Sequence, residues 1–350
     1  MKYLLLDKLT ILILSYNRHK YLKRTINYWS NYNIKLVILD GSDKKLEDKY
    51  IKSKNIKYIH NKKGLYDRLL SSAHLIDTEY MILGGDDEFY LPSALCSCVK
   101  FLLKDKTYYS CGGLAIGFRT MGKNLVGLAQ YPKLKNLHLY HDSAIYRIHN
   151  HFSNYVPAHI YSVMRSVKWN IICSNIFKKK YNFKSSEELQ FEFLVMVSGK
   201  SKIIPKLMWL RNLEVPPADG EAAISKQIRI NKWWLEKKFQ NEKLDFLKTM
   251  LKACNELASN QKTKFNEDII SKIFKNYIDR EKEKSPVDDL FRVINKLIPI
   301  KIKNFIKFFL GIYKRSLINE AISLEAQDIY VNYKELDFAI SILEEYQNND

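Results

Sequence analysis

Residues 80–92, YMILGGDDEFYLP, form an apolar run that ends in two glycines and is followed at once by three acids. The acids are Asp86, Asp87 and Glu88. Three adjacent carboxylates repel one another, and a bound cation offsets that repulsion most easily. A strand that delivers carboxylates to a loop at its carboxyl end also places them where α/β proteins bind ligands. The stretch therefore predicts a strand, an acidic loop and a site for Mn²⁺ or Mg²⁺.

The same stretch resembles the GGDEF signature of diguanylate cyclases with one extra Asp. That signature lies at the tip of a β-hairpin, so a second strand should follow it. Here residues 91–103, LPSALCSCVKFLL, have a Pro at the start of a helix and apolar residues at helical spacing. We therefore expect a strand, a loop and a helix, and we set the cyclase interpretation aside.

Further apolar runs before this loop alternate with segments of helical spacing. The expected strands are residues 9–14, 35–39, 56–59 and 79–83, and the expected helices between them are residues 19–32 and 64–75. Continuous apolar strands of this kind predict an α/β fold, Rossmann-like, with a mainly parallel sheet flanked by helices and ligands at the carboxyl ends of the strands.

The pattern changes after residue 103 to shorter strands and loops, with a helix at residues 186–197 and a last strand at residues 202–210. From about residue 221 almost everything has helical spacing. We therefore expect one α/β domain over residues 1–218 and a C-terminal α-helical region over residues 219–350.

Composition limits the class of protein. The 350 residues are 46% hydrophobic and 13% aromatic, which is enough for a globular core. The net charge of +19 suits nucleic acids, nucleotide phosphates or anionic lipid surfaces as partners. Five cysteines without metal-finger spacing predict reduced thiols and a cytoplasmic location. No stretch has the roughly 18 uncharged apolar residues of a spanning helix, so any membrane contact should be peripheral.

One basic amphipathic segment runs from Ile298 to Arg315. Its apolar residues recur at helical spacing and its lysines lie elsewhere, which is typical of a helix at an anionic membrane surface. Packing against neighbouring helices, with the lysines in solvent, explains the pattern equally well. Both interpretations stay open.

The order of four motifs resembles the nucleotide-sugar half of family-2 glycosyltransferases with the GT-A fold. The motifs are SYNR after the first strand, DGSD after the second, a Gly-led helix, and GDDE after the fourth strand. The resemblance is greatest to bacterial family-2-like proteins whose acidic motif is Asp-Asp-Asp-Phe before a Pro, and it covers about residues 8–215. Two departures are Leu39 in place of the first Asp of a doubled pair and Glu88 in place of a third Asp.

The resemblance implies a metal-dependent, inverting transfer of sugar from a UDP-, GDP- or CMP-linked donor to a bacterial surface glycan or lipid-linked acceptor. Residues 8–103 would form the nucleotide-binding half and residues 104–218 the acceptor half. The enzyme would work in the cytoplasm, with a peripheral position on the inner face of the cytoplasmic membrane as a further expectation. We expect no nucleic-acid partner.

The resemblance also assigns residues to the site. Asp87 and Glu88 would bind the metal. The residues expected at the nucleotide are Ser15, Asn17, Arg18, Asp40, Gly64, Arg68 and Asp86. Ordinary turns at residues 16–17 and 40–41, and a surface ion pair of Arg68, are simpler explanations that stay open.

The catalytic base of such enzymes comes from an acidic pair at the start of a helix after the acceptor-side strands. Glu187 and Glu188 occupy that place, with Glu188 preferred and Glu192 one turn further on as the fallback. Acids in the first turn of a helix are also favoured by its dipole alone.

Three histidines upstream of this helix, His149, His151 and His159, are a weak metal candidate. If His149 and His151 lie on a strand they share a face, but the sequence identifies no third ligand. We therefore expect an acceptor-side wall of aromatic and hydrogen-bonding residues there.

Two functions of other classes stay open at this point. A basic nucleic-acid-binding or scaffold protein would explain the charge, but the basic residues are dispersed and no recognised motif is present. A nucleotidyltransferase would also use an acidic metal loop, but no Gly-rich loop with Lys follows the first strand.

Overall fold

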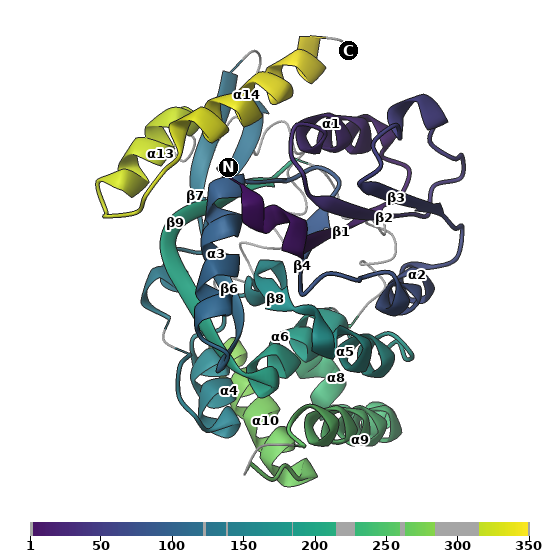
Figure 1. The fold of residues 1–350 in the computed structure, drawn as a ribbon. Coiled ribbons are helices and arrows are strands. Elements are labelled where there is room, and N and C mark those ends of the chain that lie inside the picture. The colour runs from purple at the N-terminus through teal and green to yellow at the C-terminus, as the bar shows by residue number, and fades with distance from the viewer. Residues whose placement is uncertain are drawn as a thin grey trace.

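The computed structural model describes residues 3–121, 124–137, 139–183, 185–214, 228–259, 263–283 and 315–348. In this part of the chain a nine-stranded mixed sheet runs in the order β3-β2-β1-β4-β8-β6-β9-β5, with β7 paired to β6 (Figure 1). The strands are β1 (Leu9–Ser15), β2 (Lys35–Asp40), β3 (Ile56–His60), β4 (Tyr80–Gly85), β5 (Phe89–Tyr90), β6 (Tyr108–Met121), β7 (Asn124–Gln130), β8 (Val163–Arg165) and β9 (Lys200–Asn212).

The first half of the sheet is parallel, as predicted. β1 lies between β2 and β4 and pairs with both in parallel, and β3 extends the sheet beside β2. Helices α1 (His19–Trp29) and α2 (Leu65–Ser71) connect these strands. Because β1 has a strand on each side and helices over its faces, its apolar run is almost entirely buried.

The second half of the sheet is mixed. β8 pairs antiparallel with both β4 and β6, so β4 and β6 point the same way, and β9 is parallel to β6. The carboxyl ends of β1, β2, β4, β6 and β9 therefore meet at one edge of the sheet. This arrangement brings residues that are far apart in sequence to the acidic loop, which we define as Asp86, Asp87 and Glu88.

The acidic loop is followed by a two-residue strand, β5, which the sequence did not predict. β5 pairs with β9, Phe89 opposite Leu210, and not with β4. The loop is therefore not the tip of a hairpin. Helix α3 (Pro92–Lys104) then begins at the predicted Pro.

Helices cover the second half of the sheet. α6 (Ser186–Ser198) agrees with its prediction and is buried on nearly all sides, as its continuous apolar sequence requires. It packs with α4 (Ala144–Ser153) and α5 (Trp169–Ile176). A short 3₁₀ helix, η5 (His159–Tyr161), lies between α4 and β8.

The C-terminal helices form two groups at opposite ends of the molecule (Figure 1). α8 (Ile230–Leu235), α9 (Gln240–Leu257) and α10 (Glu267–Glu283) pack around α4, α5 and α6. α13 (Leu317–Glu325) packs on β7, and α14 (Tyr333–Asn348) packs on α1.

Two sequence predictions fall outside the described residues. These are the domain boundary near residue 218 and the basic segment 298–315, of which only Arg315 is described. Among the described helices, none has the length and apolarity that a membrane crossing needs.

Candidate active site

The acidic loop is held in a buried position at the end of β4. Asp86 is fully buried and Asp87 is 7% exposed. Burial raises the pKa of Asp86 to about 7, with the charge of Arg18 opposing the rise. Burial and the neighbouring Asp87 raise the pKa of Glu88 to about 8. The loop therefore holds carboxyl groups that are costly to ionise without a positive partner.

Three arginines supply part of that positive charge. Arg18 forms a close ion pair with Asp86, 2.5 Å from Nη2 to Oδ1, and lies 3.8 Å from Asp87. Arg24 donates a hydrogen bond of 2.9 Å to the carbonyl of Asp87. Arg211, from the end of β9, lies 3.9 Å from Glu88.

Asp87 and Glu88 lie side by side over Gly85. A Cβ atom on Gly85 would lie 2.8 Å from Asp87 Oδ1 and 3.3 Å from Glu88 Cδ. Trp209 Nε1 donates a 3.0 Å hydrogen bond to Glu88 and fixes its carboxylate. Two adjacent carboxylates with only oxygen donors fit a hard cation such as Mg²⁺ or Mn²⁺. The residue set therefore suits the predicted metal, and the assignment of Asp87 and Glu88 as its ligands stays a prediction.

The loops after β1 and β2 are tied together beside the acidic loop. Asn17 has a left-handed backbone, with φ 53°, and its N–H donates to Ser42 Oγ at 2.8 Å. The Asn17 side chain exchanges two hydrogen bonds with Asp43, at 3.0 and 2.9 Å. Ser15 is buried at the end of β1. These contacts give the SYNR and DGSD motifs a common structural role.

Asp40 is buried and surrounded by donors. One oxygen accepts from the N–H and the hydroxyl of Ser42, and the other accepts from Tyr58 at 2.6 Å and lies 2.8 Å from His19 Nε2. Burial alone would raise the pKa of Asp40, but the hydrogen bonds from Ser42, Tyr58 and His19 outweigh it and lower that pKa. The carboxylate thus organises its loop, and its predicted contact with the nucleotide requires one of these partners to move.

Arg68 lies inside the protein with 3% of its surface exposed. Its Nη1 donates to the carbonyls of Ser15 and Leu39, at 2.8 and 2.7 Å. The guanidinium lies directly over Gly41, where a Cβ atom would be 2.5 Å from Arg68 Cζ. Arg68 is therefore not the surface ion pair of the simpler explanation. It holds the ends of β1 and β2 together, and its contact with a phosphate stays a prediction.

Gly64 immediately precedes α2, and its carbonyl accepts from the N–H of Arg68 at 3.1 Å. It is exposed. Arg68 links Gly64 to the loop after β2, because its N–H donates to Gly64 and its guanidinium lies over Gly41.

The acidic pair at the start of α6 is partly exposed. Glu187 accepts hydrogen bonds from Tyr66 at 3.0 Å and from Ser186 at 3.1 Å. Glu188 accepts from Tyr155 at 3.0 Å. Glu192 is fully buried, so an acceptor hydroxyl has no access to it and the fallback base is not supported.

Tyr161 connects the acidic loop with α6. Its ring packs against Trp209 with 4.4 Å between ring centroids. Burial raises the pKa of Tyr161, and the charges of Glu88 and Glu188 raise it further. Trp209 in turn donates to Glu88, and η5, which carries Tyr161, packs on α6. The acidic loop and α6 are therefore linked through Trp209 and Tyr161.

The prediction for the histidines is wrong in one respect. His149 and His151 lie on helix α4 and not on a strand, so their side chains point in different directions. His149 is exposed, whereas His151 is buried with His159 and Glu192. The sequence could not pair these residues because the contact joins three separate elements.

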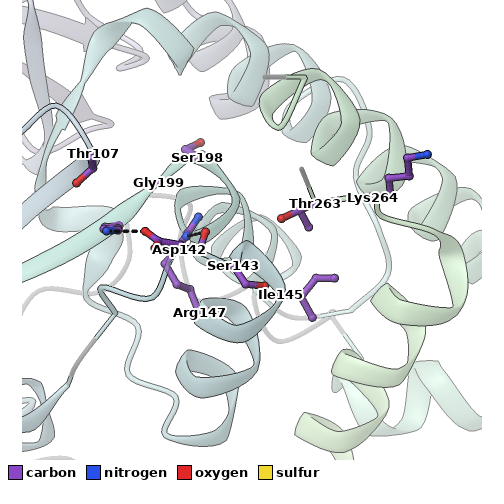
Figure 2. A pocket seen from close by; sticks show the side chains of 10 residues that line it. Thr107, Asp142, Ser143, Ile145, Arg147, Ser198, Gly199, Thr263 and Lys264 are labelled. Carbon is purple, nitrogen blue, oxygen red and sulfur yellow. Dashed lines mark hydrogen bonds and ion pairs between the residues drawn. The ribbon is translucent and has the colours of Figure 1, made fainter. Parts of the chain in front are cut away.

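A pocket of about 730 Å³ lies elsewhere (Figure 2). Thr107 before β6 and Lys200 at the start of β9 line it, so it lies at the amino edge of the sheet. An ion pair of 2.7 Å joins Lys200 to Asp142 across its wall. This pocket is separate from the acidic loop, which lies at the carboxyl edge.

Comparison with known proteins identifies the class. Residues 10–160 match the family model described as glycosyl transferase family 2. Residues 10–160 are therefore similar to a family-2 glycosyltransferase domain, in agreement with the motif order. This match favours a glycosyltransferase over the nucleic-acid-binding and nucleotidyltransferase alternatives.

Solved structures of S. aureus TarS are similar in fold. TarS 1-349 in complex with UDP-GlcNAc has a TM-score of 0.50 at 12% identity, and the match covers 98% of this chain and 92% of that one. The complex with UDP gives 0.49 at 12% identity, with the same coverage. A longer TarS structure gives 0.47 at 13% identity, and the match covers 80% of this chain and only 44% of TarS. No curated protein matches the chain by sequence.

Proposed function

We propose that this glycosyltransferase moves a sugar from a nucleotide donor to an acceptor hydroxyl with inversion at the anomeric carbon, and that it depends on Mn²⁺ or Mg²⁺. The observation that carries the proposal is the pair of side-by-side carboxylates of Asp87 and Glu88 at the carboxyl edge of the sheet. Trp209, which donates to Glu88, packs against Tyr161 of η5, and η5 packs on the helix that carries Glu188.

In the proposed reaction Glu188 removes the proton from the acceptor hydroxyl. The acceptor oxygen attacks the anomeric carbon from the face opposite the diphosphate, and the bond from that carbon to the phosphate oxygen breaks. Its electron pair leaves with the nucleoside diphosphate. Tyr155, which donates to Glu188 at 3.0 Å, orients the carboxylate for this transfer.

A cation bound by Asp87 and Glu88 would supply positive charge to the leaving diphosphate. Arg18 remains beside the buried Asp86 and balances its charge. Arg211 and Trp209 hold the Glu88 carboxylate in place from β9.

We propose a UDP-linked sugar as the donor among the three nucleotide classes considered. The crystallised TarS fragment of similar fold is in complex with UDP-GlcNAc, which supports this choice. The nucleotide would lie over the loops of β1 and β2, near Ser15, Asn17 and Asp40. The start of α2, with Gly64 and Arg68, and Asp86 of the acidic loop would complete its site.

For the acceptor we propose a bacterial surface glycan or a lipid-linked precursor at the inner face of the cytoplasmic membrane. The net charge of +19 and the basic amphipathic sequence from Ile298 to Arg315 support this location.

A panel of nucleotide sugars tests the proposal. Thermal shift with and without Mn²⁺ should show a rise in Tm with one UDP-sugar, and release of UDP should require the cation. Asp87→Ala should abolish the Mn²⁺-dependent shift, whereas Glu188→Gln should bind donor normally and lose transfer at least 100-fold. If Asp87→Ala turns over normally, the proposed metal dependence is wrong.

A further inference from the structure

A second cluster of titratable side chains lies at the middle of α6, away from the acidic loop. His151 comes from α4, His159 from η5 and Glu192 from α6. All three are fully buried. His151 Nε2 lies 2.8 Å from Glu192 Oε2, and His159 Nδ1 lies 3.2 Å from the same oxygen. The other oxygen of Glu192 accepts from the N–H of Ile160 at 3.0 Å.

Hydrogen bonding does not satisfy this cluster. Within the described structure, the ring nitrogens of His151 and His159 and the Oε2 atom of Glu192 are buried without a hydrogen bond of acceptable geometry. The two short distances to Glu192 are ion-pair distances, but their angles are not those of good hydrogen bonds. Buried polar groups in this condition call for a further partner between them.

The spacing of the three groups fits a metal ion. Their ligand atoms all lie within 4.8 Å of one another. Ligands at about 2.0–2.1 Å from a tetrahedral ion are about 3.3–3.4 Å apart. The separation of 3.2 Å between His159 Nδ1 and Glu192 Oε2 is close to that value, and the separation of 2.8 Å between His151 Nε2 and Glu192 Oε2 would lengthen by about 0.5 Å around a bound ion.

We propose that His151, His159 and Glu192 bind one Zn²⁺ ion, with a water molecule as the fourth ligand. Two imidazoles and one carboxylate are the ligand set that Zn²⁺ prefers, whereas Mg²⁺ and Mn²⁺ prefer oxygen ligands. The ion is therefore distinct from the cation proposed at Asp87 and Glu88. This inference does not depend on the proposed function.

The ion would position the predicted base. It joins α4, η5 and α6, and Glu188 lies on α6 one turn before Glu192. Tyr155, just after α4, donates to Glu188. An ion that fixes α4 against α6 therefore also fixes this hydrogen bond, and its loss should lower the stability of the acceptor half.

Metal content of the purified full chain tests the proposal directly. Protein from zinc-supplemented medium, washed with EDTA to remove surface ions, should contain one zinc per chain by mass spectrometry. Glu192→Gln and His151→Asn should contain less than a fifth of that amount. His149→Asn is the matched control, since His149 is exposed on the same helix, and it should keep its zinc. Protein grown with Co²⁺ in place of zinc should show the visible absorption of a low-symmetry cobalt site.

Each other outcome overturns the proposal. Wild-type protein without zinc would do so, even if the Glu192 variant cannot be purified. Retention of zinc by both variants, or loss of zinc from Asp87→Ala alone, would place the ion elsewhere. Because the readout is metal content, its failure leaves the test of nucleotide-sugar transfer untouched.

Discussion

At the scale of single residues, Arg18 stands next to the acidic loop where positive charge is needed. Its side chain is 15% exposed and that of Asp86 is fully buried. Breaking a buried ion pair leaves one charge without compensation, which costs several kcal/mol unless the group becomes neutral. Since the pKa of Asp86 is already raised to about 7, protonation limits the cost.

We expect Arg18→Gln to lower the free energy of unfolding by about 2 kcal/mol in the absence of metal. Mn²⁺ should then raise the Tm of the variant more than that of the wild type, because a cation replaces the missing charge. Thermal denaturation with and without Mn²⁺ measures both effects. Lys8→Gln, at an exposed ion pair with Glu79, should leave the stability nearly unchanged, because solvent screens such a pair. Equal Mn²⁺ shifts in wild type and Arg18→Gln would contradict the prediction.

Gly85 gives a second test at this scale. A methyl group there would lie 2.8 Å from Asp87 Oδ1 and must displace that carboxylate. We expect Gly85→Ala to reduce metal-dependent turnover at least tenfold while its circular dichroism spectrum stays that of the wild type. A folded variant with normal turnover and normal Mn²⁺ dependence would show that Asp87 is not a ligand.

At the scale of helices and strands, the local sequence pattern predicted those elements whose formation depends mainly on their own residues. The apolar runs of β1, β2 and β4 are buried by their neighbours, and that of the edge strand β3 is half-buried, so their hydrophobicity alone predicts them. The short strand β5 was missed because its partner, β9, is over a hundred residues away. Helix α4 was missed because two of its polar residues, Arg147 and His151, are buried by tertiary packing. Arg147 donates to the carbonyl of Met196 at 3.0 Å.

In the candidate site, too, some residues were predicted from the sequence and others are brought together only by the fold. The acidic loop, the acidic pair at the start of α6 and the loops after β1 and β2 were predicted from the order of the motifs in the sequence. Trp209 donates to Glu88, and Tyr161 packs on Trp209, because the sheet brings β9 and β8, the strand that follows η5, close to the acidic loop. The His151–His159–Glu192 cluster likewise depends on three elements meeting, which a single sequence does not encode as a spacing.

Glu335 on α14 caps the start of helix α3, so replacing it tests how these two helices pack. It is 3% exposed and accepts hydrogen bonds from the N–H and hydroxyl of Ser93, at the start of α3, and from Tyr3. Glu335→Ala leaves these donors without an acceptor, so we expect a loss of about 2–3 kcal/mol in the free energy of unfolding. Urea denaturation measures it. Glu344→Ala, exposed on the same helix, should be nearly neutral, and equal effects of the two variants would contradict the prediction.

Lys168 joins two helices and gives a pH-dependent test. Its ammonium donates to the carbonyls of Ser198 and Leu257, at the ends of α6 and α9. Burial, and then the charge of Arg147, lowers the pKa of Lys168 from 10.5 to about 8. Between these two values the unfolded chain binds more protons than the folded protein, so this group adds stability as the pH rises.

We expect the stability of the wild type relative to Lys168→Met to increase between pH 8 and pH 10. Taking the difference between the two proteins removes the contributions of other titrating groups. Urea denaturation at pH 7.5, 8.5 and 9.5 measures it. A difference that stays constant or decreases over this range would show that the Lys168 pKa is not lowered.

At the scale of the whole molecule, the excess of positive charge is the property that must be explained. The chain has 57 Lys and Arg residues against 38 Asp and Glu residues. Folded proteins gain little stability from such an imbalance, whereas an anionic surface attracts it, at about 1 kcal/mol for each Lys or Arg near the surface. The basic amphipathic sequence from Ile298 to Arg315 combines this charge with aromatic and aliphatic residues.

If that segment docks on lipid, its lysines should contribute more to binding than lysines elsewhere. We expect the full chain to sediment with vesicles containing phosphatidylglycerol and to stay in solution with phosphatidylcholine alone. Replacing Lys301, Lys303 and Lys307 by Gln should weaken binding at least tenfold, since about 1 kcal/mol is lost for each. The control replaces three exposed lysines of the α9 region, Lys237, Lys238 and Lys248. If both triple variants bind equally, attraction by net charge is sufficient and the segment has no special role at the membrane.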